Sequence, residues 1–390
     1  MSESPLSLSA TPRRSTTPVL SFEQARSLIA AHGSPLLVIA RSRIISAYQT
    51  MRAHLRDVEL FYAAKANSNA AILSLLRQEG ASIDVSSAGE VNAALAAGFT
   101  PSQMLHTHPC KSEADLRTCY EQGVRWFVYD NPYELDKLAA HAPDANVLLR
   151  IALSADSSVL KLSSKFGADR DESIRFLIAA ERRGLNVRGL SFHLGSQCLD
   201  PRDFEPAMAI MRDVIEEAWD QGIPITHLDI GGGFPSPYRH QTVMPLDEYC
   251  DEVRASIDKH LSGMPLTLMA EPGRALCAEA VTLITTVIGK SRRQGTLWYY
   301  LDEGIYGAFS GKRPGHTDYP LVVENASGLP FSDCVIAGPT CDSGDVLYHD
   351  HALPELNVGD LILVPSMGAY TSASACNFNG LPITRSIVID

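Results

Sequence analysis

Eight short apolar runs recur along the first 270 residues, and each is followed by a segment with helical spacing. Near-continuous apolarity is typical of strands that are buried on both faces of a parallel sheet. The predicted strands cover residues 58–64, 82–85, 103–107, 125–129, 146–151, 187–193, 225–230 and 266–270. The intervening segments carry apolar residues three and four positions apart, which predicts amphipathic helices.

Several of these predicted helices stop at a glycine, which is the residue that best accepts the left-handed conformation after a last helical turn. The glycines are Gly80, Gly98, Gly123, Gly184 and Gly222. Eight strand–helix units in about 230 residues predict a (β/α)8 barrel, an α/β fold. The alternative is an open doubly wound sheet, but no GxGxxG follows the first strand.

After about residue 278 the pattern changes, and hardly any helical period remains. Strand-like runs separated by Gly, Pro and Asp occupy residues 280–288, 296–302, 319–325, 333–338, 360–366 and 385–390. They predict a C-terminal all-β domain of Greek-key or β-sandwich type.

These patterns divide the chain into four parts. We expect a disordered tail at 1–17, because it is rich in Ser, Thr and Pro. A segment at 18–40 is expected to pack with the β domain, and its run 35–40 to be a strand of that domain. The barrel is expected at 41–277 and the β domain at 278–390.

The composition excludes several functional classes. The chain has 33 Lys and Arg against 45 Asp and Glu, a net charge of −12, so neither nucleic acid nor an anionic membrane is an expected partner. No apolar run reaches the roughly 18 residues of a membrane helix. Eight cysteines lie scattered without a CxxC pair, which argues against a metal site and a disulfide framework and favours a reducing cytoplasm.

The ends of the predicted barrel strands carry polar residues, and the C-terminal strand ends are where such barrels place their chemistry. The set consists of Lys65, Asp84, His106, Asp130, Arg150, His193, Gly231–Gly233 and Glu271. Each has an ordinary structural interpretation when taken alone. Their common location favours a functional site.

Lys65 follows the first strand, in FYAAKAN. A strand-end lysine usually reaches solvent. At a barrel mouth, burial is expected to lower its pKa and free the amine to form a Schiff base. The glycines of DIGGGFP form either a tight turn or a phosphate cradle of backbone N–H groups.

The segment EPGR places Glu271 and Arg274 at the end of the eighth strand. Glu271 is either an ion-pair partner or the group that holds a protonated heterocyclic nitrogen, with Arg274 as a phosphate ligand. In HLGS, His193 offers a ring to stack on a cofactor, unless it is a core histidine, and Ser196 offers a hydroxyl. Lysine, phosphate cradle and carboxylate are the set that pyridoxal phosphate requires.

Six motifs appear in the order in which one known family carries them: FYAAKAN, SFHLGSQ, LDIGGGFP, EPGRAL, GPTCDSGDVL and MGAYTSASACNFNG. Over about residues 35–390 the chain resembles the pyridoxal-phosphate-dependent decarboxylases of the alanine-racemase-like fold. These include the ornithine, lysine and diaminopimelate decarboxylases, and the eukaryotic-type ornithine decarboxylases look most similar.

The resemblance implies a role for each matching residue. Lys65 would bind the cofactor covalently, His193 would stack on its ring, and Glu271 would pair with its pyridine nitrogen. Other residues near the cofactor would be Asp84, Glu90 and Arg150, with the phosphate held by Ser196, Gly231, Gly232, Gly233, Arg274 and Tyr370.

The resemblance also implies a homodimer with shared sites. Cys341 and Asp342 would enter from the partner subunit, Cys341 to protonate the α-carbon and Asp342 to hold the distal amine of the substrate. Phe378 would line the substrate end. Lys165 and Asp345 match a salt bridge across the family's dimer interface.

The expected activity is decarboxylation of a basic L-amino acid, ornithine or lysine, to the diamine and CO2. A carboxylate at the pyridine nitrogen favours it, because the protonated ring is a strong electron sink, whereas racemases of this fold typically carry an arginine there. Alternatives are a modified or pathway-specific amino acid and a catalytically inactive regulatory relative. Diaminopimelate is less favoured, because in that group a glutamate usually follows the cysteine.

One segment departs from the family pattern. Between Tyr306 and Tyr319 the family commonly carries an aspartate that helps to bind the distal amine, whereas this chain has GKRPGHTDYP. Either Asp318 takes its place or the acidic partner is lost. Arg313 becomes the candidate partner if the substrate side chain is negative.

Overall fold

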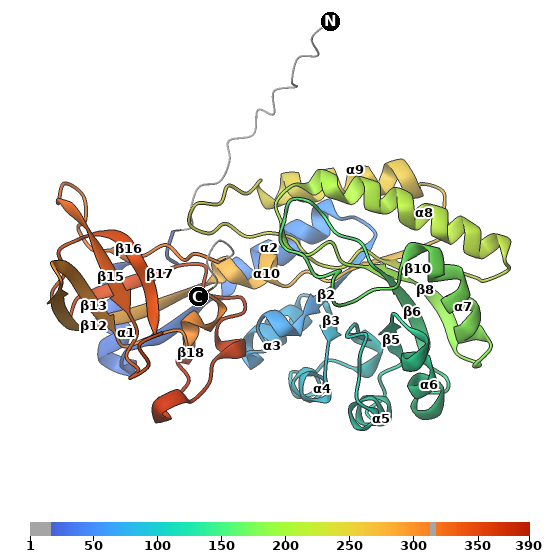
Figure 1. Cartoon of the computed structure of the whole chain (residues 1–390), viewed down its shortest axis with the longest axis horizontal. Coiled ribbons are helices and arrows are strands. Elements are labelled where there is room, and N and C mark those ends of the chain that lie inside the picture. Colours follow the sequence, from blue (N-terminus) through green and yellow to red (C-terminus); the bar gives the residue numbers. More distant parts are fainter. Residues whose placement is uncertain (1–16, 313–316) are drawn as a thin grey trace, which may run out of the picture.

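The computed structural model describes residues 17–312 and 317–390. Its N-terminal part is a closed barrel of eight parallel strands, shown with its ring of helices in Figure 1. The strands are β2 (Val58–Ala63), β3 (Ser82–Val85), β4 (Met104–His106), β5 (Trp126–Tyr129), β6 (Asn146–Ile151), β8 (Asn186–Phe192), β10 (His227–Asp229) and β11 (Thr267–Ala270). All eight predicted strands are therefore confirmed.

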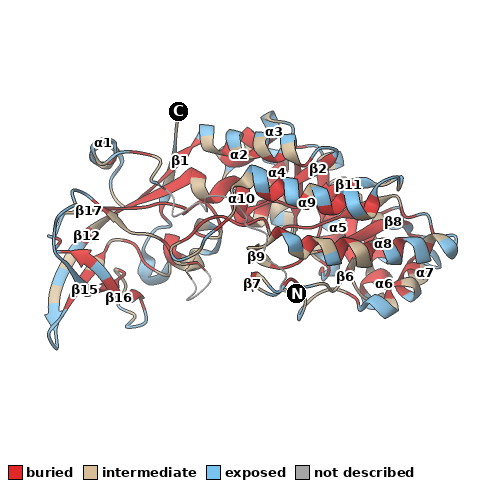
Figure 2. Cartoon of the chain, turned by 90° about the horizontal axis from the view of Figure 1, so that it is seen from above, coloured by how far each residue is buried: buried red, intermediate tan, exposed pale blue. Residues whose placement is uncertain are grey.

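Helices cover the outside of the barrel, and each buries one face while exposing the other (Figure 2). They are α2 (Arg41–His54), α3 (Ala70–Gln78), α4 (Ala88–Ala96), α5 (Glu113–Glu121), α6 (Pro132–His141), α7 (Ser173–Glu181), α8 (Phe204–Asp220) and α9 (Leu246–Leu261). The short α10 (Arg274–Cys277) follows the last strand.

The helix boundaries have local causes. The side chains of Asn69, Ser87 and Ser112 accept hydrogen bonds from the first-turn N–H groups of α3, α4 and α5. The five glycines predicted to end helices all have φ between 77° and 97°, the left-handed region that suits glycine.

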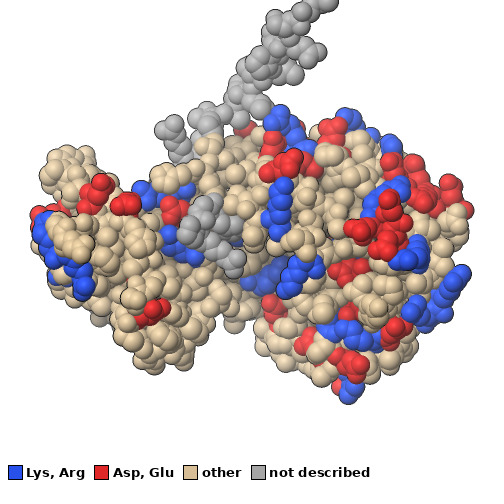
Figure 3. All heavy atoms as spheres, viewed as in Figure 1, with Lys and Arg blue, Asp and Glu red and all other residues tan. Residues whose placement is uncertain are grey.

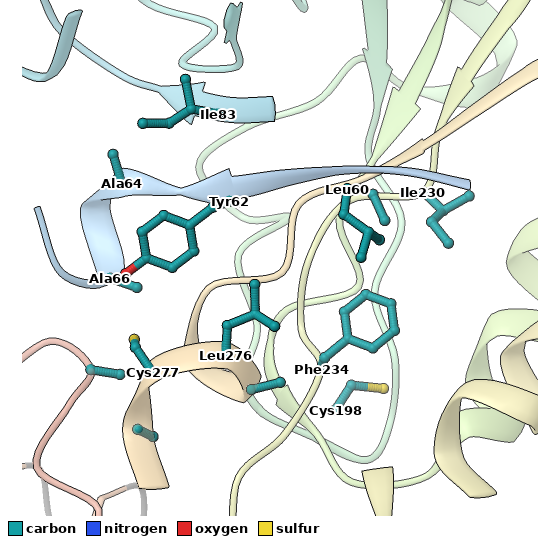
Figure 4. Packing of buried hydrophobic residues seen from close by; sticks show 14 of the residues in the cluster. Leu60, Tyr62, Ala64, Ala66, Ile83, Cys198, Ile230, Phe234, Leu276 and Cys277 are labelled. Carbon is teal, nitrogen blue, oxygen red and sulfur yellow. The ribbon is translucent and has the colours of Figure 1, made fainter. Parts of the chain in front are cut away.

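Strand β2 shows how the pleat separates two apolar layers. Leu60 and Tyr62 point to the same side of the strand, into the large cluster that also contains Leu276 (Figure 4). Phe61 points the other way, into a cluster with residues of four other barrel strands: Leu105, Val128, Leu148 and Met269. Because side chains alternate along a strand, Ala63 is on the side of Phe61, and it lines the cavity at the barrel mouth together with Lys65.

Eight further strands form a second sheet. They are β1 (Leu36–Ala40), β12 (Val281–Arg293), β13 (Thr296–Leu301), β14 (Val322–Val323), β15 (Phe331–Ala337), β16 (Val346–Pro354), β17 (Leu361–Val364) and β18 (Arg385–Ile389). The predicted fold class, a (β/α)8 barrel followed by an all-β region, is confirmed. A two-stranded pair, β7 (Ser158–Leu160) with β9 (Ser196–Cys198), lies near the barrel mouth.

The long strand β12 joins two parts of this sheet. Its first part pairs with β1 and β17, and after a register shift between Val287 and Gly289 its second part pairs with β13. Strand β1 also pairs in parallel with β18. The run 35–40, which precedes the barrel in the sequence, therefore contributes a strand to the sheet whose other strands follow the barrel.

Three features of this region differ from the sequence expectations. Strand β16 was not predicted, because its VLYHDHALP sequence mixes charged and apolar residues. The run 319–325 yields only Val322–Val323 as strand. Helix α1 (Phe22–His32) occupies the segment before β1, capped by Ser21 and packed near Leu36 and Leu363.

The expected tail at 1–17 lies, except for its last residue, outside the described residues. In the described ranges no helix is both long enough and apolar enough to cross a bilayer. On the face shown in Figure 3, acidic and basic side chains are interspersed over the barrel helices.

Candidate active site

A cavity of about 350 Å³ opens at the C-terminal ends of the barrel strands. The predicted residues that line it are Lys65, His193, Ser196, Gly233, Glu271, Arg274 and Tyr370. Tyr370 comes from the β region, in a left-handed conformation with φ of 57°, and its N–H donates to the Ala66 carbonyl at 2.8 Å. The wall therefore combines strand ends of the barrel with a loop of the β region.

Lys65 follows β2 on a single 3-10 turn, and its Nζ contacts the carboxylate of Asp84. The same Nζ lies 3.5 Å from Oε2 of Glu271. Burial lowers the pKa of Lys65, but the two carboxylates outweigh burial and raise the pKa above the ordinary lysine value. The expectation of a lowered lysine pKa is therefore wrong, because it considered burial without the facing charges.

Three buried carboxyl groups lie in this part of the site: Asp84 and Glu271 face Lys65, and Asp229 lies beside Glu271. Thr107 Oγ1 donates to Asp84 at 2.5 Å, and burial raises the pKa of Asp84 to about 7. Burial, reinforced by Asp229, raises the pKa of Glu271 to about 8. The nearby cations do not compensate the burial of Glu271, so a protonated heterocyclic nitrogen placed against it would be stabilised.

The opposite end of the cavity suits an anion. Arg274 is 6% exposed, and its guanidinium donates to the Tyr238 hydroxyl at 2.7 Å and to Ser196 Oγ at 3.1 Å. Among the described residues no carboxylate lies within 4 Å of this guanidinium. A buried cation without a counter-charge is costly, and a phosphate would satisfy it. The Tyr370 ring centroid lies 4.7 Å from Cζ of Arg274.

The glycine run after β10 allows a close backbone approach. A Cβ on Gly231 would lie 2.1 Å from the Phe192 carbonyl oxygen, and one on Gly233 would lie 2.6 Å from that of Gly195. A Cβ on Gly232 would lie 3.0 Å from Nε2 of His193. These contacts explain why glycine occupies all three positions, and they leave Gly233 on the cavity wall.

His193 lies between the two ends of the cavity. Its Nδ1 accepts a hydrogen bond from the Gly195 N–H at 3.0 Å. Burial, together with the charges of Arg150 and Lys65, lowers the pKa of His193 well below its ordinary value. The ring is therefore a neutral, flat group facing the cavity, which suits stacking on an aromatic cofactor.

The predicted substrate residues lie elsewhere in the chain. Cys341 is exposed and Asp342 is half-buried on the β region, and neither lines the cavity. The Tyr306 hydroxyl donates to Asp342 at 2.5 Å, and the Tyr306 ring stacks on Phe378 at a centroid distance of 4.1 Å. Asn379 Oδ1 accepts from the Cys341 N–H at 3.0 Å. We call these five residues the loop cluster.

Tyr306 and Asn379 have roles that sequence reasoning missed. The available signals were their motifs, DEGIYG and NFNG, which each place a polar group beside an aromatic ring. Tyr238 was also missed, although it carries the hydroxyl that binds Arg274.

Asp318 does not take part in the cavity wall. Its carboxylate lies 3.5 Å from Lys312 Nζ and 4.0 Å from Arg239 Nη1, so its charge is already compensated. Arg313 lies outside the described residues.

Asp345 is buried and accepts hydrogen bonds from its own chain, from the Ile305 N–H and from both donors of Thr340. Lys165 is exposed on the barrel, and its salt bridge with Asp345 of a second subunit stays a prediction. Glu90 accepts from the Ser86 N–H near Asp84.

Residues 41–278 match the family described as pyridoxal-dependent decarboxylase, pyridoxal binding domain. The match covers more than half of the chain. The chain belongs to this family.

Relatives extend the likeness to most of the chain. The lysine/ornithine decarboxylase of Selenomonas ruminantium is 40% identical and covers 95% of this chain and 93% of that protein. The ornithine decarboxylase of Schizosaccharomyces pombe is 35% identical over 88% of this chain and 81% of that protein. The crystal structure of a lysine/ornithine decarboxylase from Vibrio vulnificus with putrescine has a TM-score of 0.87 at 37% identity, covering 95% and 99% of the two chains.

Membership confirms that the protein is a pyridoxal-phosphate-dependent decarboxylase. When bound, pyridoxal phosphate supplies an electron sink for the electron pair left by the departing CO2. The residues present fit it, with Glu271 at the end that suits a protonated nitrogen and Arg274 with the glycine run at the end that suits a phosphate. The eukaryotic ornithine decarboxylase was expected to be more similar, but the bacterial lysine/ornithine decarboxylase has the higher identity to this chain, 40% against 35%.

Proposed function

We propose that this decarboxylase converts L-lysine and L-ornithine to CO2 and the corresponding diamines. The observation that carries the proposal is Asp342, a half-buried carboxylate that Tyr306 holds beside Cys341. Such a carboxylate suits the distal ammonium of a basic amino acid. The bacterial relatives named for both substrates support the same assignment.

The absence of Asp318 from the cavity wall bears on discrimination between the two substrates. One carboxylate on an exposed loop fixes the distal amine less tightly than two carboxylates would. Lysine and ornithine differ by one methylene, which a pocket typically distinguishes by only about 1–3 kcal/mol. We therefore expect both to be turned over at rates within about a hundredfold of each other.

On the barrel side, we assign Lys65 as the residue that binds the cofactor and exchanges protons with the substrate amine. Asp84 holds Nζ of Lys65 in place, and Thr107 holds Asp84. Glu271 keeps the facing nitrogen protonated, while Arg274 and Ser196 hold the phosphate. His193 fixes the plane of the ring, with Arg150 nearby.

We further propose that the active protein is a homodimer with two shared sites. Among the described residues, neither Cys341 nor Asp342 lines the cavity of its own chain, whereas the loop cluster presents both at the surface. A second subunit that places its loop cluster over the cavity would complete the site. The cytoplasmic location stays a prediction.

Cys341 is proposed to protonate the α-carbon once CO2 has left. In the Cys341→Ala variant a larger share of turnovers should end in aldehyde in place of diamine, because the proton no longer arrives at the correct carbon. Chromatographic quantification of both products tests this. Cys376→Ala, another exposed cysteine, is the matched control. Clean diamine at the wild-type rate from Cys341→Ala would exclude the role.

A CO2-release panel over lysine, ornithine, arginine and diaminopimelate tests the function itself. Lysine and ornithine should be turned over, and the other two should react at least tenfold more slowly. Preference for diaminopimelate would overturn the substrate assignment. If none of the four releases CO2 although the protein shows the yellow absorption of bound cofactor, a modified amino acid becomes the leading substrate class.

A further inference from the structure

A cluster of three potential metal ligands lies outside the cavity, between the barrel and its helices. One donor atom each of His106, Asp115 and Cys119 lies within 4.8 Å of the others. His106 ends β4, while Asp115 and Cys119 are four residues apart on α5 and therefore share a helix face. The pairing of β4 with its own following helix brings the three together.

His106 is the unusual member. Its side chain is 0% exposed, and within the described part of the chain neither ring nitrogen has a hydrogen-bond partner. Nε2 lies 3.8 Å from Oδ2 of Asp115, which is too far for a hydrogen bond. Buried polar groups are almost always satisfied, so an imidazole with two unused nitrogens in an apolar layer needs an explanation.

Asp115 and Cys119 have the surroundings that are typical of metal ligands. Oδ1 of Asp115 accepts from the Ala88 N–H at 2.9 Å, which fixes the carboxylate and leaves Oδ2 turned towards His106. Metal-binding carboxylates commonly have such a fixed second oxygen. Cys119 is fully buried, while the Asp115 side chain is 27% exposed and gives the cluster a path to solvent.

We propose that His106, Asp115 and Cys119 bind one Zn²⁺ ion per chain, with water as the fourth ligand. Nitrogen, oxygen and sulfur donors are those that zinc takes, and tetrahedral bonds of about 2.0–2.3 Å place ligand atoms roughly 3.3–3.8 Å apart. The present separations, all within 4.8 Å, exceed that range by at most about 1.0 Å, which side-chain rotation covers.

Binding has a defined proton balance. The Sγ–H bond of Cys119 breaks, an Sγ–Zn bond forms, and the proton leaves to solvent, whereas His106 binds as neutral imidazole. Because one proton is released for each ion bound, zinc affinity should increase with pH.

The site is structural and lies next to the active site. Thr107 follows His106 and holds Asp84, while Asp115 holds the start of α4. An ion here would join β4, α5 and the first turn of α4. Zinc should therefore raise the thermal midpoint of the holoenzyme in a concentration-dependent way.

The test is zinc binding to chelator-treated holoenzyme, measured by competition with a chromophoric zinc indicator. Wild type should bind one equivalent per chain. Cys119→Ala and His106→Phe should each bind more than about tenfold more weakly. Cys250→Ala is the matched control, because Cys250 is also a buried helical cysteine, and Cys110→Ser controls for a neighbouring exposed thiol. Both controls should bind as wild type does.

A second measurement on wild type does not depend on the variants being folded. X-ray absorption of the zinc-loaded holoenzyme should show one sulfur among nitrogen and oxygen ligands. Failure to bind an equivalent, a ligand shell without sulfur, or binding that Cys119→Ala leaves intact would overturn the proposal. Loss of binding in Cys110→Ser alone would place the ion on the surface and overturn it too.

Discussion

The cavity at the barrel mouth and the loop cluster on the β region differ in how completely one chain builds them. At the barrel mouth the carboxylates of Asp84 and Glu271 are buried and already face the half-buried Lys65. In the loop cluster Cys341 is exposed and Asp342 is half-buried, and Asp342 accepts a hydrogen bond from a tyrosine. The barrel-mouth cavity is therefore a binding site built by one chain, whereas the loop cluster places its functional groups at the surface.

The difference indicates a division of work. A cofactor that must be held permanently suits a rigid site whose charges are set by the fold of a single chain. A substrate that must enter and leave suits a site that is completed only where two surfaces meet. The following experiments test this comparison, beginning with the largest expected effect.

Replacement of Lys65 should abolish decarboxylation, because Lys65 is the proposed attachment point of the cofactor. In Lys65→Ala we expect kcat to fall by more than about a thousandfold, because no other described amine lines the cavity. Borohydride reduction of wild-type holoenzyme followed by peptide mapping should place the pyridoxyl label on Lys65. A label on Lys111 or Lys165 would contradict the assignment, and buried Lys111, which pairs with Glu134, is the natural internal control.

Mixing two defective variants tests whether the regions come from different subunits. Lys65→Ala should form almost no diamine, and Cys341→Ala should form little. Combined under conditions of subunit exchange, they should recover up to about a quarter of the wild-type rate of diamine formation. Half of the dimers are then mixed, and each mixed dimer has one intact site of two. Each variant alone is the control. Proven exchange without recovery would place both residues in the same subunit's site.

Asp342→Asn should affect the substrate and spare the cofactor. A charge-assisted hydrogen bond to a partly desolvated ammonium contributes about 1.5–3 kcal/mol, so KM for lysine and ornithine should rise about tenfold to over a hundredfold. The dissociation constant of the cofactor, followed by its absorption, should stay unchanged. If cofactor binding weakens in parallel, the loop cluster is not separate from the barrel site.

Asp318→Asn is the matched variant with the smallest expected effect. Its carboxylate pairs with Lys312 and Arg239 away from the cavity wall, and partly exposed pairs contribute little. KM for either substrate should change by less than about twofold. A rise similar to that of Asp342→Asn would mean that Asp318 reaches the substrate when the two subunits meet.

Much of the barrel and of its site could be predicted from local sequence. Buried parallel strands are apolar almost throughout, and helix ends carry their own capping residues and glycines, so the eight barrel strands and α3 to α5 are encoded within short windows. Strand β16 was not predicted, and β14 was predicted to be longer than it is. The extent of both strands depends on the strands with which they pair, and their own composition does not reveal it.

The sequence by itself determined which chemical groups stand at the strand ends and in what order, since each motif is a continuous segment. Only the tertiary structure decided what those groups face. The sign of the Lys65 pKa shift depends on Asp84 and Glu271, 19 and 206 positions further along the chain, and the charge of Asp318 is compensated by Arg239. Likewise, His106 meets Asp115 and Cys119 only because β4 packs against α5. Electrostatic and ligand interactions depend on distance in space, and the fold alone sets that distance.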